Sequence, residues 1–273
     1  MIQSLIAAYA RPNVAVFWPV LIWLGLAFSP ARAQELNSDS SSRLTSSLSV
    51  GAGYVQLKEE LLRGLVHTGF NAQVRFASCV VSPDRIWDWS IAVSPGVLSW
   101  HGSTDLSFDV APMDAGYAVA YTTPSPRLHF FLGGYARLQT TYTQYIHLDG
   151  LHPYWATLDH VGVRHWLRWE LANGDGLSVQ SDLALLAVAS RPPEWRDYAT
   201  TTLNAWRIVQ RVYESPRIVT LFDCFRFMTR TDYTMNSDIG PRFLCYYQFE
   251  YDRVDFPAVY TNIQSMIGIG IPL

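Results

Sequence analysis

The sequence predicts an all-β protein: a single antiparallel transmembrane β-barrel of about ten strands. Three observations predict it. Apolar and polar residues alternate with a two-residue period along most of the chain, which places them on opposite faces of β-strands. Charged residues make up only 16 % of the chain and aromatic residues 14 %, whereas a soluble domain carries about a quarter charged residues. An apolar segment near the N-terminus also has the composition of a secretion signal.

Residues 1–33 are expected to be a signal peptide. Residues 14–28 are almost wholly apolar, and the Ala-Arg-Ala sequence at 31–33 offers the small residues of a signal peptidase site. The alternative is a membrane-anchoring helix. The apolar run is interrupted by Pro19 and is shorter than the roughly 20 residues that span a bilayer, so a cleaved signal is the prediction.

The mature chain is expected to form one domain. Residues 34–43 are polar and rich in serine, which predicts a flexible leader, and the barrel domain then covers residues 44–273. The signal segment holds two arginines and no acid, so 18 basic and 23 acidic side chains remain, a net charge of −5. This balance argues against a nucleic-acid partner, which would require a basic patch.

The three cysteines predict neither a disulfide framework nor a metal site. Cys79, Cys224 and Cys245 are an odd number without the spacing of metal ligands. Cys224 and Cys245 lie on neighbouring predicted strands but on opposite faces, so they are not expected to form a disulfide. No cofactor is predicted.

Ten segments of alternating polarity are expected to be strands. They are residues 44–58, 65–80, 87–94, 104–121, 128–142, 154–172, 177–185, 217–230, 241–254 and 259–271. The alternation changes phase near Ala111 and Pro112, which predicts a β-bulge. Asp223 falls on the apolar side of its segment. Residues 191–216 are open to two interpretations: a long loop with a helix over 203–213, or two further strands, which would make twelve.

The apolar face of these strands is expected to contact lipid. It is apolar in nearly every segment, whereas the opposite face is polar and poor in large aliphatic residues, so it would make an inadequate core for a soluble protein. In hydrocarbon an open sheet edge leaves backbone groups unsatisfied, so the sheet must close. The alternatives are a secreted β-sandwich and a soluble periplasmic barrel that binds lipid.

The chain resembles the small bacterial outer-membrane β-barrel proteins. The resemblance rests on the signal segment, the alternation over residues 44–271, and the terminal strand 259–271. It implies the outer membrane of a Gram-negative-type cell, contact with outer-membrane lipid, and insertion by the barrel-assembly machinery. That class usually ends in an aromatic residue, whereas this chain ends in Ile271, Pro272 and Leu273. The resemblance identifies no specific family, and it leaves the oligomeric state open.

Short and long connections are expected to alternate, as they do in such barrels. The predicted periplasmic turns are 81–85, 122–126, 173–176 and 231–240, and the predicted outer loops are 59–64, 101–103, 146–153, 191–216 and 253–256. With an even number of strands, this pattern places both termini in the periplasm.

The lumen is expected to be largely closed and lined by arginines and acids. The predicted lumen-lining residues are Arg75, Arg137, Arg164, Arg168, Glu170, Asp182, Arg226, Arg230, Arg242 and Glu250, with Asp88 beside them. The interior of a barrel this small is narrow and filled by side chains. Arginines paired with carboxylates would fill that space while satisfying their donors.

Three functions remain open on this basis. The first is a structural or binding barrel with a largely closed lumen, whose outer loops contact a partner. The second is a narrow small-solute channel lined by arginines. The third is an outer-membrane lipid hydrolase or protease using His129 or His160, although neither Gly-x-Ser-x-Gly nor His-Glu-x-x-His occurs in the sequence. No catalytic residue is predicted.

Overall fold

The computed structural model describes residues 42–60, 64–125, 127–145, 153–191, 216–235, 242–255 and 258–273. The predicted signal peptide and residues 34–41 of the predicted leader therefore lie outside the described residues. Within the described residues there are eleven antiparallel strands in one sheet. No helix in this part of the chain is long and apolar enough to cross a membrane.

Most strands are long enough to run the whole height of the sheet. The bounds are β1 Arg43–Glu59, β2 Leu65–Val81, β3 Arg85–Trp100, β4 Ser103–Ser125, β5 Leu128–Gln144, β6 Pro153–Glu170, β7 Gly176–Ser190, β8 Arg217–Thr220, β9 Cys224–Met235, β10 Phe243–Val254 and β11 Tyr260–Pro272.

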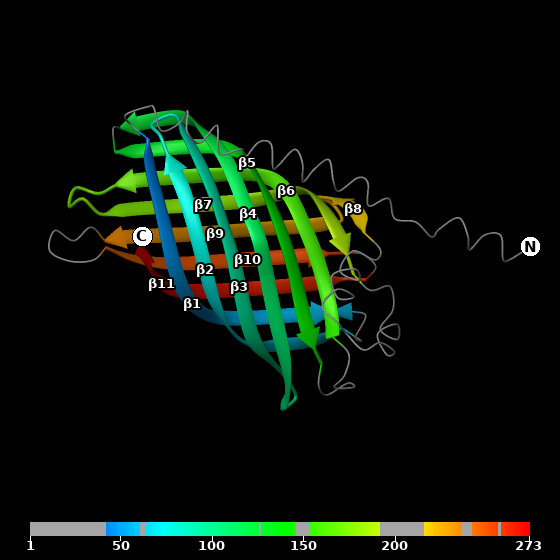
Figure 1. Ribbon diagram of the computed structural model, residues 1–273. Coiled ribbons are helices and arrows are strands. Elements are labelled where there is room, and N and C mark those ends of the chain that lie inside the picture. The colour runs from blue at the N-terminus through cyan, green and yellow to red at the C-terminus, as the bar shows by residue number, and fades with distance from the viewer. Residues whose placement is uncertain are drawn as a thin grey trace, which may run out of the picture.

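Ten of these strands close into a barrel (Figure 1). Each strand pairs with the next along the chain, β7 pairs with β9, and β1 pairs with β11 to complete the ring. Because closure leaves no free edge, the backbone groups of the ring are paired without water. The predicted antiparallel ten-stranded barrel is confirmed.

The twelve-strand alternative is wrong. β7 pairs directly with β9 from Gly176↔Thr234 to Leu183↔Phe227, so no additional strand lies between them. The short strand β8 pairs with the remaining part of β7, at Leu186–Ala189, beyond the point where β9 leaves it. It therefore extends the sheet at one end of the barrel without entering the ring.

The prediction of one continuous strand over residues 217–230 is also wrong. The chain turns at 221–223 between β8 and β9. The backbone N–H of Asp223 donates to the carbonyl of Thr220 at 3.0 Å, and that of Leu221 donates to Leu185 at 3.0 Å. Asp223, which interrupted the polar–apolar alternation, thus lies in a turn and on neither face of a strand.

The predicted bulge in the fourth strand is confirmed. The pairing of β4 shifts register against β3 between Ser90 and Ala92, and against β5 between Val110 and Met113. The extra residue reverses which face alternate side chains occupy. Asp109 before the bulge and Asp114 after it are both buried inside the barrel.

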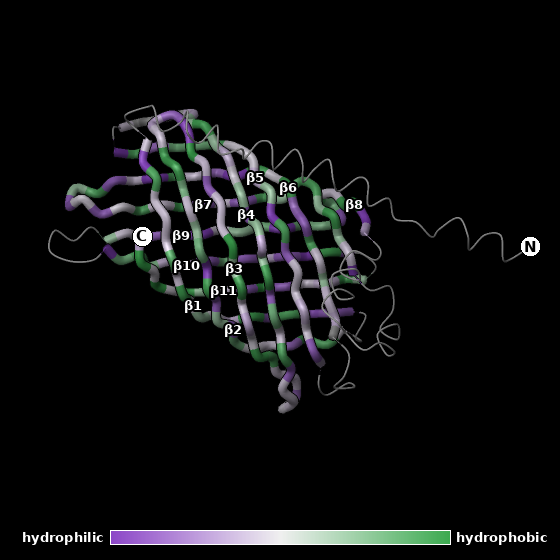
Figure 2. The backbone as a smooth tube through the Cα atoms, viewed as in Figure 1, coloured by the Kyte–Doolittle hydropathy of each residue, from purple (hydrophilic) through white to green (hydrophobic). Residues whose placement is uncertain are grey.

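Hydrophilic and hydrophobic residues alternate along the strands (Figure 2), and their burial shows that the outside of the barrel is apolar and the inside polar. Mid-strand side chains such as Phe70, Val50 and Ile267 are 74 %, 51 % and 67 % exposed. The buried side chains include many that are polar or charged, among them Arg164, Arg226 and Glu250. This inversion of a soluble protein's distribution is the organisation of a barrel that sits in lipid.

The two ends of the barrel differ. The turn end carries the turns after β2, β4, β6 and β9, and the loop end carries the connections after β1, β3, β5, β7 and β10. Ser47 pairs with Pro272, so β1 begins and β11 ends together at the turn end. Both termini of the barrel domain therefore share one end, as the sequence predicted.

Candidate functional site

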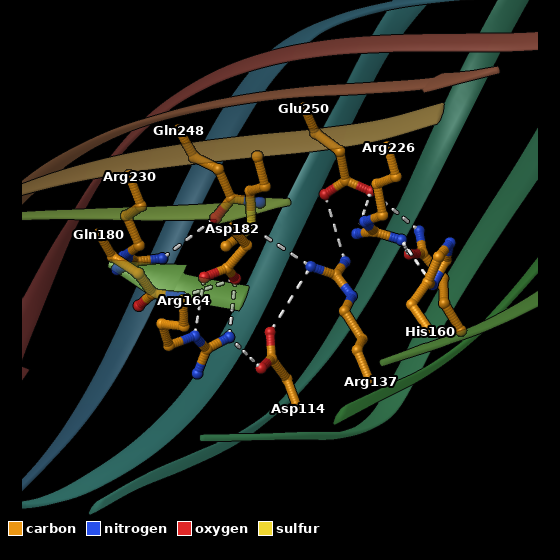
Figure 3. Close-up of polar contacts among 12 residues, drawn as sticks. Asp114, Arg137, His160, Arg164, Gln180, Asp182, Arg226, Arg230, Gln248 and Glu250 are labelled. Atoms are coloured by element: carbon orange, nitrogen blue, oxygen red, sulfur yellow. Dashed lines mark hydrogen bonds and ion pairs between the residues drawn. The ribbon is translucent and has the colours of Figure 1, made fainter. Parts of the chain in front are cut away.

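The lumen is filled at mid-height by a cluster of charged side chains that we call the central network. It comprises Asp88, Asp109, Asp114, Arg137, Gln139, His160, Arg164, Gln180, Asp182, Arg226, Arg230, Gln248, Glu250 and Asp252. All are at least nine-tenths buried, and they come from β3, β4, β5, β6, β7, β9 and β10. Most are drawn in Figure 3.

Arg164 is the centre of one half of this network (Figure 3). Its Nε and Nη2 donate to the two carboxylate oxygens of Asp182 at 2.8 and 2.7 Å. Its Nη1 donates to Asp88 at 2.5 Å and its Nη2 also donates to Asp114 at 2.6 Å. One guanidinium therefore joins carboxylates from β3, β4 and β7, which is the geometry that makes arginine suited to buried ion pairs.

Gly116 leaves space for the ion pair beside it. A Cβ added at Gly116 would lie 2.6 Å from Arg164 Nη1 and 2.7 Å from Asp88 Oδ1, closer than van der Waals contact allows. Gly116 stands directly opposite Asp88 in the β3–β4 pairing. Its missing side chain leaves the room in which the Arg164–Asp88 pair forms.

Arg226 and Arg137 form the other half of the network on Glu250 (Figure 3). Arg226 Nη2 donates to Glu250 Oε1 at 2.7 Å, and Arg137 Nη2 donates to Glu250 Oε2 at 3.3 Å. Arg137 also approaches Asp114 at 3.7 Å, and so joins the two halves. Arg226 Nη1 contacts His160 Nδ1 at 3.3 Å. The network thus spans the lumen from β4 to β10.

The loop end of the lumen is closed by a second, mostly apolar layer that we call the aromatic layer. Its buried members are Val55, Leu57, Leu98, Tyr145, Tyr154, Trp155, Ala156, Leu158, Ala187, Ala189, Val219, Cys224, Val254 and Tyr260. Burial raises the pKa of Tyr145 well above its usual value, so this phenol stays neutral. Its members come from the loop-end halves of strands around most of the ring.

One ion pair lies within the aromatic layer. Arg191, the residue after β7, donates through Nη2 to both carboxylate oxygens of Glu59 at 2.6 and 2.5 Å. Arg191 Nη1 donates to the carbonyl of Ala258 at 2.6 Å, and its guanidinium carbon is 5.1 Å from the ring centre of Tyr260. Arg191 therefore ties the ends of β1, β7 and β11 together.

The turn end is open. A cavity of about 790 Å³, which we call the vestibule, reaches from the rim to the central network at Asp88 and Gln180. Arg75, Arg168 and Arg242 line it, together with Phe131 and Trp166. The lumen is therefore a blind pocket at one end and a packed interior beyond it.

The predicted lumen-lining residues divide between these regions. Arg137, Arg164, Asp182, Arg226, Arg230 and Glu250 are buried in the central network, as is Asp88. Arg75 and Arg168 are half-buried on the wall of the vestibule, and Glu170 and Arg242 are exposed at its rim. All ten predicted residues thus lie along the lumen, but only six of them form the packed network.

Sequence reasoning missed several contributors. Asp114 was not among the predicted residues, although the phase change near Pro112 was a signal that it faces inward. Gln139 bridges Arg226 and Asp109 at 2.5 and 2.9 Å. It was missed because the predicted lumen set was limited to charged residues. The Arg191–Glu59 pair lies at the strand ends, where alternation carries no information.

The two histidines considered for hydrolysis, His129 and His160, do not form a common site with each other or with the nearby His165 and Ser178. His160 is buried against Arg226, His129 lines the vestibule, and Nε2 of His165 contacts the Tyr121 hydroxyl at 3.0 Å. Within the described residues, Ser178 makes no hydrogen bond with a histidine. Nor does any group of three or more His, Cys, Asp or Glu in this part of the chain have the geometry of a metal site.

The cysteines are separated as predicted. Cys224 is buried and Cys245 is exposed. Cys224 pairs with Val254 and Cys245 with Tyr233, at opposite ends of the β9–β10 ladder. Cys79 is half-buried and lines the vestibule.

Comparison with known proteins identifies no family and finds only distant structural similarities. No family model and no curated protein matches the sequence. The structure is similar to that of the outer membrane protease OmpT from Escherichia coli, with 7 % identity, a TM-score of 0.40, and coverage of 85 % of this chain and 96 % of that one.

Two further structures are similar at the same level. Neisserial surface protein A shows 11 % identity and a TM-score of 0.36 over 83 % of this chain and 96 % of that one. The translocator domain of the autotransporter NalP from Neisseria meningitidis shows 6 % identity and a TM-score of 0.41 over 91 % and 97 %. These TM-scores and identities are too low to indicate an activity for this chain.

Proposed function

We propose that this protein is an outer-membrane β-barrel with a structural or binding role and a closed lumen. One observation carries the proposal. Arg164, Arg226 and Glu250, which occupy the middle of the lumen, are 0 %, 1 % and 1 % exposed. Side chains that lined a water-filled pore would contact water, so no aqueous path runs past them.

The aromatic layer supports the same conclusion independently. It fills the loop end with buried aromatic and aliphatic side chains packed around the Arg191–Glu59 ion pair, and ions do not readily cross a dry, mostly apolar layer. The central network and the aromatic layer therefore block the lumen in series. This disfavours the narrow channel, because the arginines that would attract anions at mid-height are already paired with carboxylates.

The outer surface supports a membrane location. An exterior of exposed Val, Ile, Leu and Phe side chains requires a lipid environment. In our proposal the signal peptide is cleaved, the barrel-assembly machinery inserts the chain, and the turn end with both termini faces the periplasm. The longer connections at the loop end then face outward and provide the surface for a partner.

The test is the behaviour of the mature chain after refolding into detergent and liposomes. We expect a sheet-type circular dichroism spectrum and a gel mobility that changes on heating, as intact barrels unfold only then. Liposomes containing the protein should swell in small sugars no faster than empty liposomes. A chain that is monomeric and soluble without detergent would refute the membrane assignment, and porin-like swelling would refute the closed lumen.

A further inference from the structure

We propose that the vestibule binds an organic anion: a phosphate ester or carboxylate group carried on an apolar body. This inference deepens the proposed binding role and rests on it in one respect, because the closed lumen makes the vestibule a blind pocket. Its volume of about 790 Å³ falls within the roughly 300–1,000 Å³ of small-molecule sites. A ligand would enter from the turn end and stop at the central network.

The charge of the vestibule favours an anionic ligand. Arg75 on β2 and Arg168 on β6 are half-buried and both line the cavity. Within the described residues neither guanidinium has a hydrogen-bond or ion-pair partner, whereas the arginines of the central network each have two or more polar partners. A partly buried guanidinium with no acid in hydrogen-bond or ion-pair contact is costly, and its fork of donors matches phosphate and carboxylate.

Most of the acids that line the vestibule already accept hydrogen bonds from other side chains. Asp88, at the floor, accepts from Arg164 at 2.5 Å, and Asp232 accepts from Arg230 at 2.8 Å. Asp175 accepts from Tyr233 and from Asn173. Glu170 is the remaining acid of the lining and is exposed at the rim. The unpaired arginines therefore give the vestibule a positive potential that a low-dielectric wall strengthens.

An apolar wall lies beside these arginines. Phe131 packs with Ile86 and Ala118, and Cys79 and Trp166 pack against this cluster. Phe131, Trp166 and Cys79 all line the cavity. A site that offers both a charged and an aromatic surface selects a ligand with an anionic group and an apolar body over a bare inorganic ion.

Binding is tested by calorimetry on the refolded protein in nonionic detergent. The probes are inorganic phosphate, phenyl phosphate, and a short-chain phosphatidic acid, which separates a lipid source from a free solute. We expect phenyl phosphate to bind at one site and more tightly than inorganic phosphate, with phenol not binding. Tighter binding of the phosphatidic acid would identify the ligand as a lipid head group with its chains.

Matched variants locate the site. Arg75→Gln and Arg168→Gln should each raise the Kd for phenyl phosphate at least tenfold. Arg253→Gln removes the same charge at the loop end, where Arg253 pairs with Asp255 at 2.9 Å, and should leave the Kd unchanged. Equal losses in all three variants, or no saturable binding in the parent protein, would overturn the proposal.

Cys79 provides a second readout inside the vestibule. In a Cys224→Ser, Cys245→Ser background, an anionic methanethiosulfonate should modify Cys79 faster than a cationic one, and phenyl phosphate should protect it. Arg75→Gln should reduce the preference for the anionic reagent. A preference for the cationic reagent would contradict the charge assigned to the vestibule. Conductance tests the closed lumen separately, so a failure of the binding proposal can be distinguished from a failure of the closed lumen.

Discussion

Arg164 and Asp182 face each other directly across the β6–β7 ladder and form a two-point ion pair, with distances of 2.8 and 2.7 Å. A one-residue slip between these strands would turn one partner toward lipid. The pair therefore fills the lumen and also favours a single register of β6 against β7. The same ion pair therefore helps to fix the strand pairing and to block the lumen.

Arg164→Met should destabilise the barrel strongly. The substitution keeps much of the side-chain volume but leaves Asp88, Asp114 and Asp182 buried without their shared cation. Removing one partner of a buried pair costs about 3–5 kcal/mol. The measurement is urea unfolding of the protein in lipid vesicles, followed by the gel-mobility change. Arg253→Met, at an exposed pair, should cost less than about 1 kcal/mol, and equal costs would contradict this role for Arg164.

Gly116→Ala should disturb the central network although it adds only a methyl group. Its Cβ would lie 2.6 Å from Arg164 Nη1, so the guanidinium must move away from its carboxylates, and overpacking of this kind costs about 1–3 kcal/mol. Gly134→Ala is the matched control, because its Cβ would meet nothing closer than 3.5 Å. The control should be neutral or stabilising by about 0.5–1 kcal/mol, and the reverse order would refute the steric argument.

Val50→Arg should show whether the outer face contacts hydrocarbon. Val50 lies in the middle of β1 and is 51 % exposed, and arginine at the middle of the bilayer costs about 2–4 kcal/mol. Leu44→Arg, at the start of β1 and 63 % exposed, should cost only about 0–1 kcal/mol. Unfolding in vesicles measures both. Equal, small costs would mean that water or protein covers this face.

The Arg191–Glu59 pair should behave as a coupled unit. Arg191→Gln and Glu59→Gln should each cost about 3–5 kcal/mol, because each leaves one buried charge without its partner. The double variant should cost clearly less than the sum of the two, and the difference is the coupling energy of the pair. Additive losses in the double-mutant cycle would show that Arg191 acts through Tyr154 and Tyr260 instead.

Most of the barrel could be predicted from the sequence because each strand has one face in lipid and one in the lumen. The alternation in β1 and β2 placed their ends within two residues of the observed bounds. It failed over 217–230, because the polar–apolar alternation on either side continues in phase across the turn at 221–223 between β8 and β9. Asp223 was the local signal of that turn.

The site could be predicted only in part, because alternation assigns a side chain to a face but not to a partner. Arg164 and Asp182 were both expected in the lumen, yet their pairing depends on register. The difference between Arg164, which is paired, and Arg168, which lines the vestibule, depends on depth along β6. Neither register nor depth can be derived from one sequence.

The central claim is that the lumen is closed, and the electrical conductance of the purified protein in planar lipid bilayers tests it most directly. The measurement uses heat-modifiable, folded protein in concentrated potassium chloride. Bilayers that contain the protein should show no discrete current steps above those of the bare membrane. Stable single-channel currents, with a reversal potential that shows anion selectivity, would contradict the account and establish an open pore.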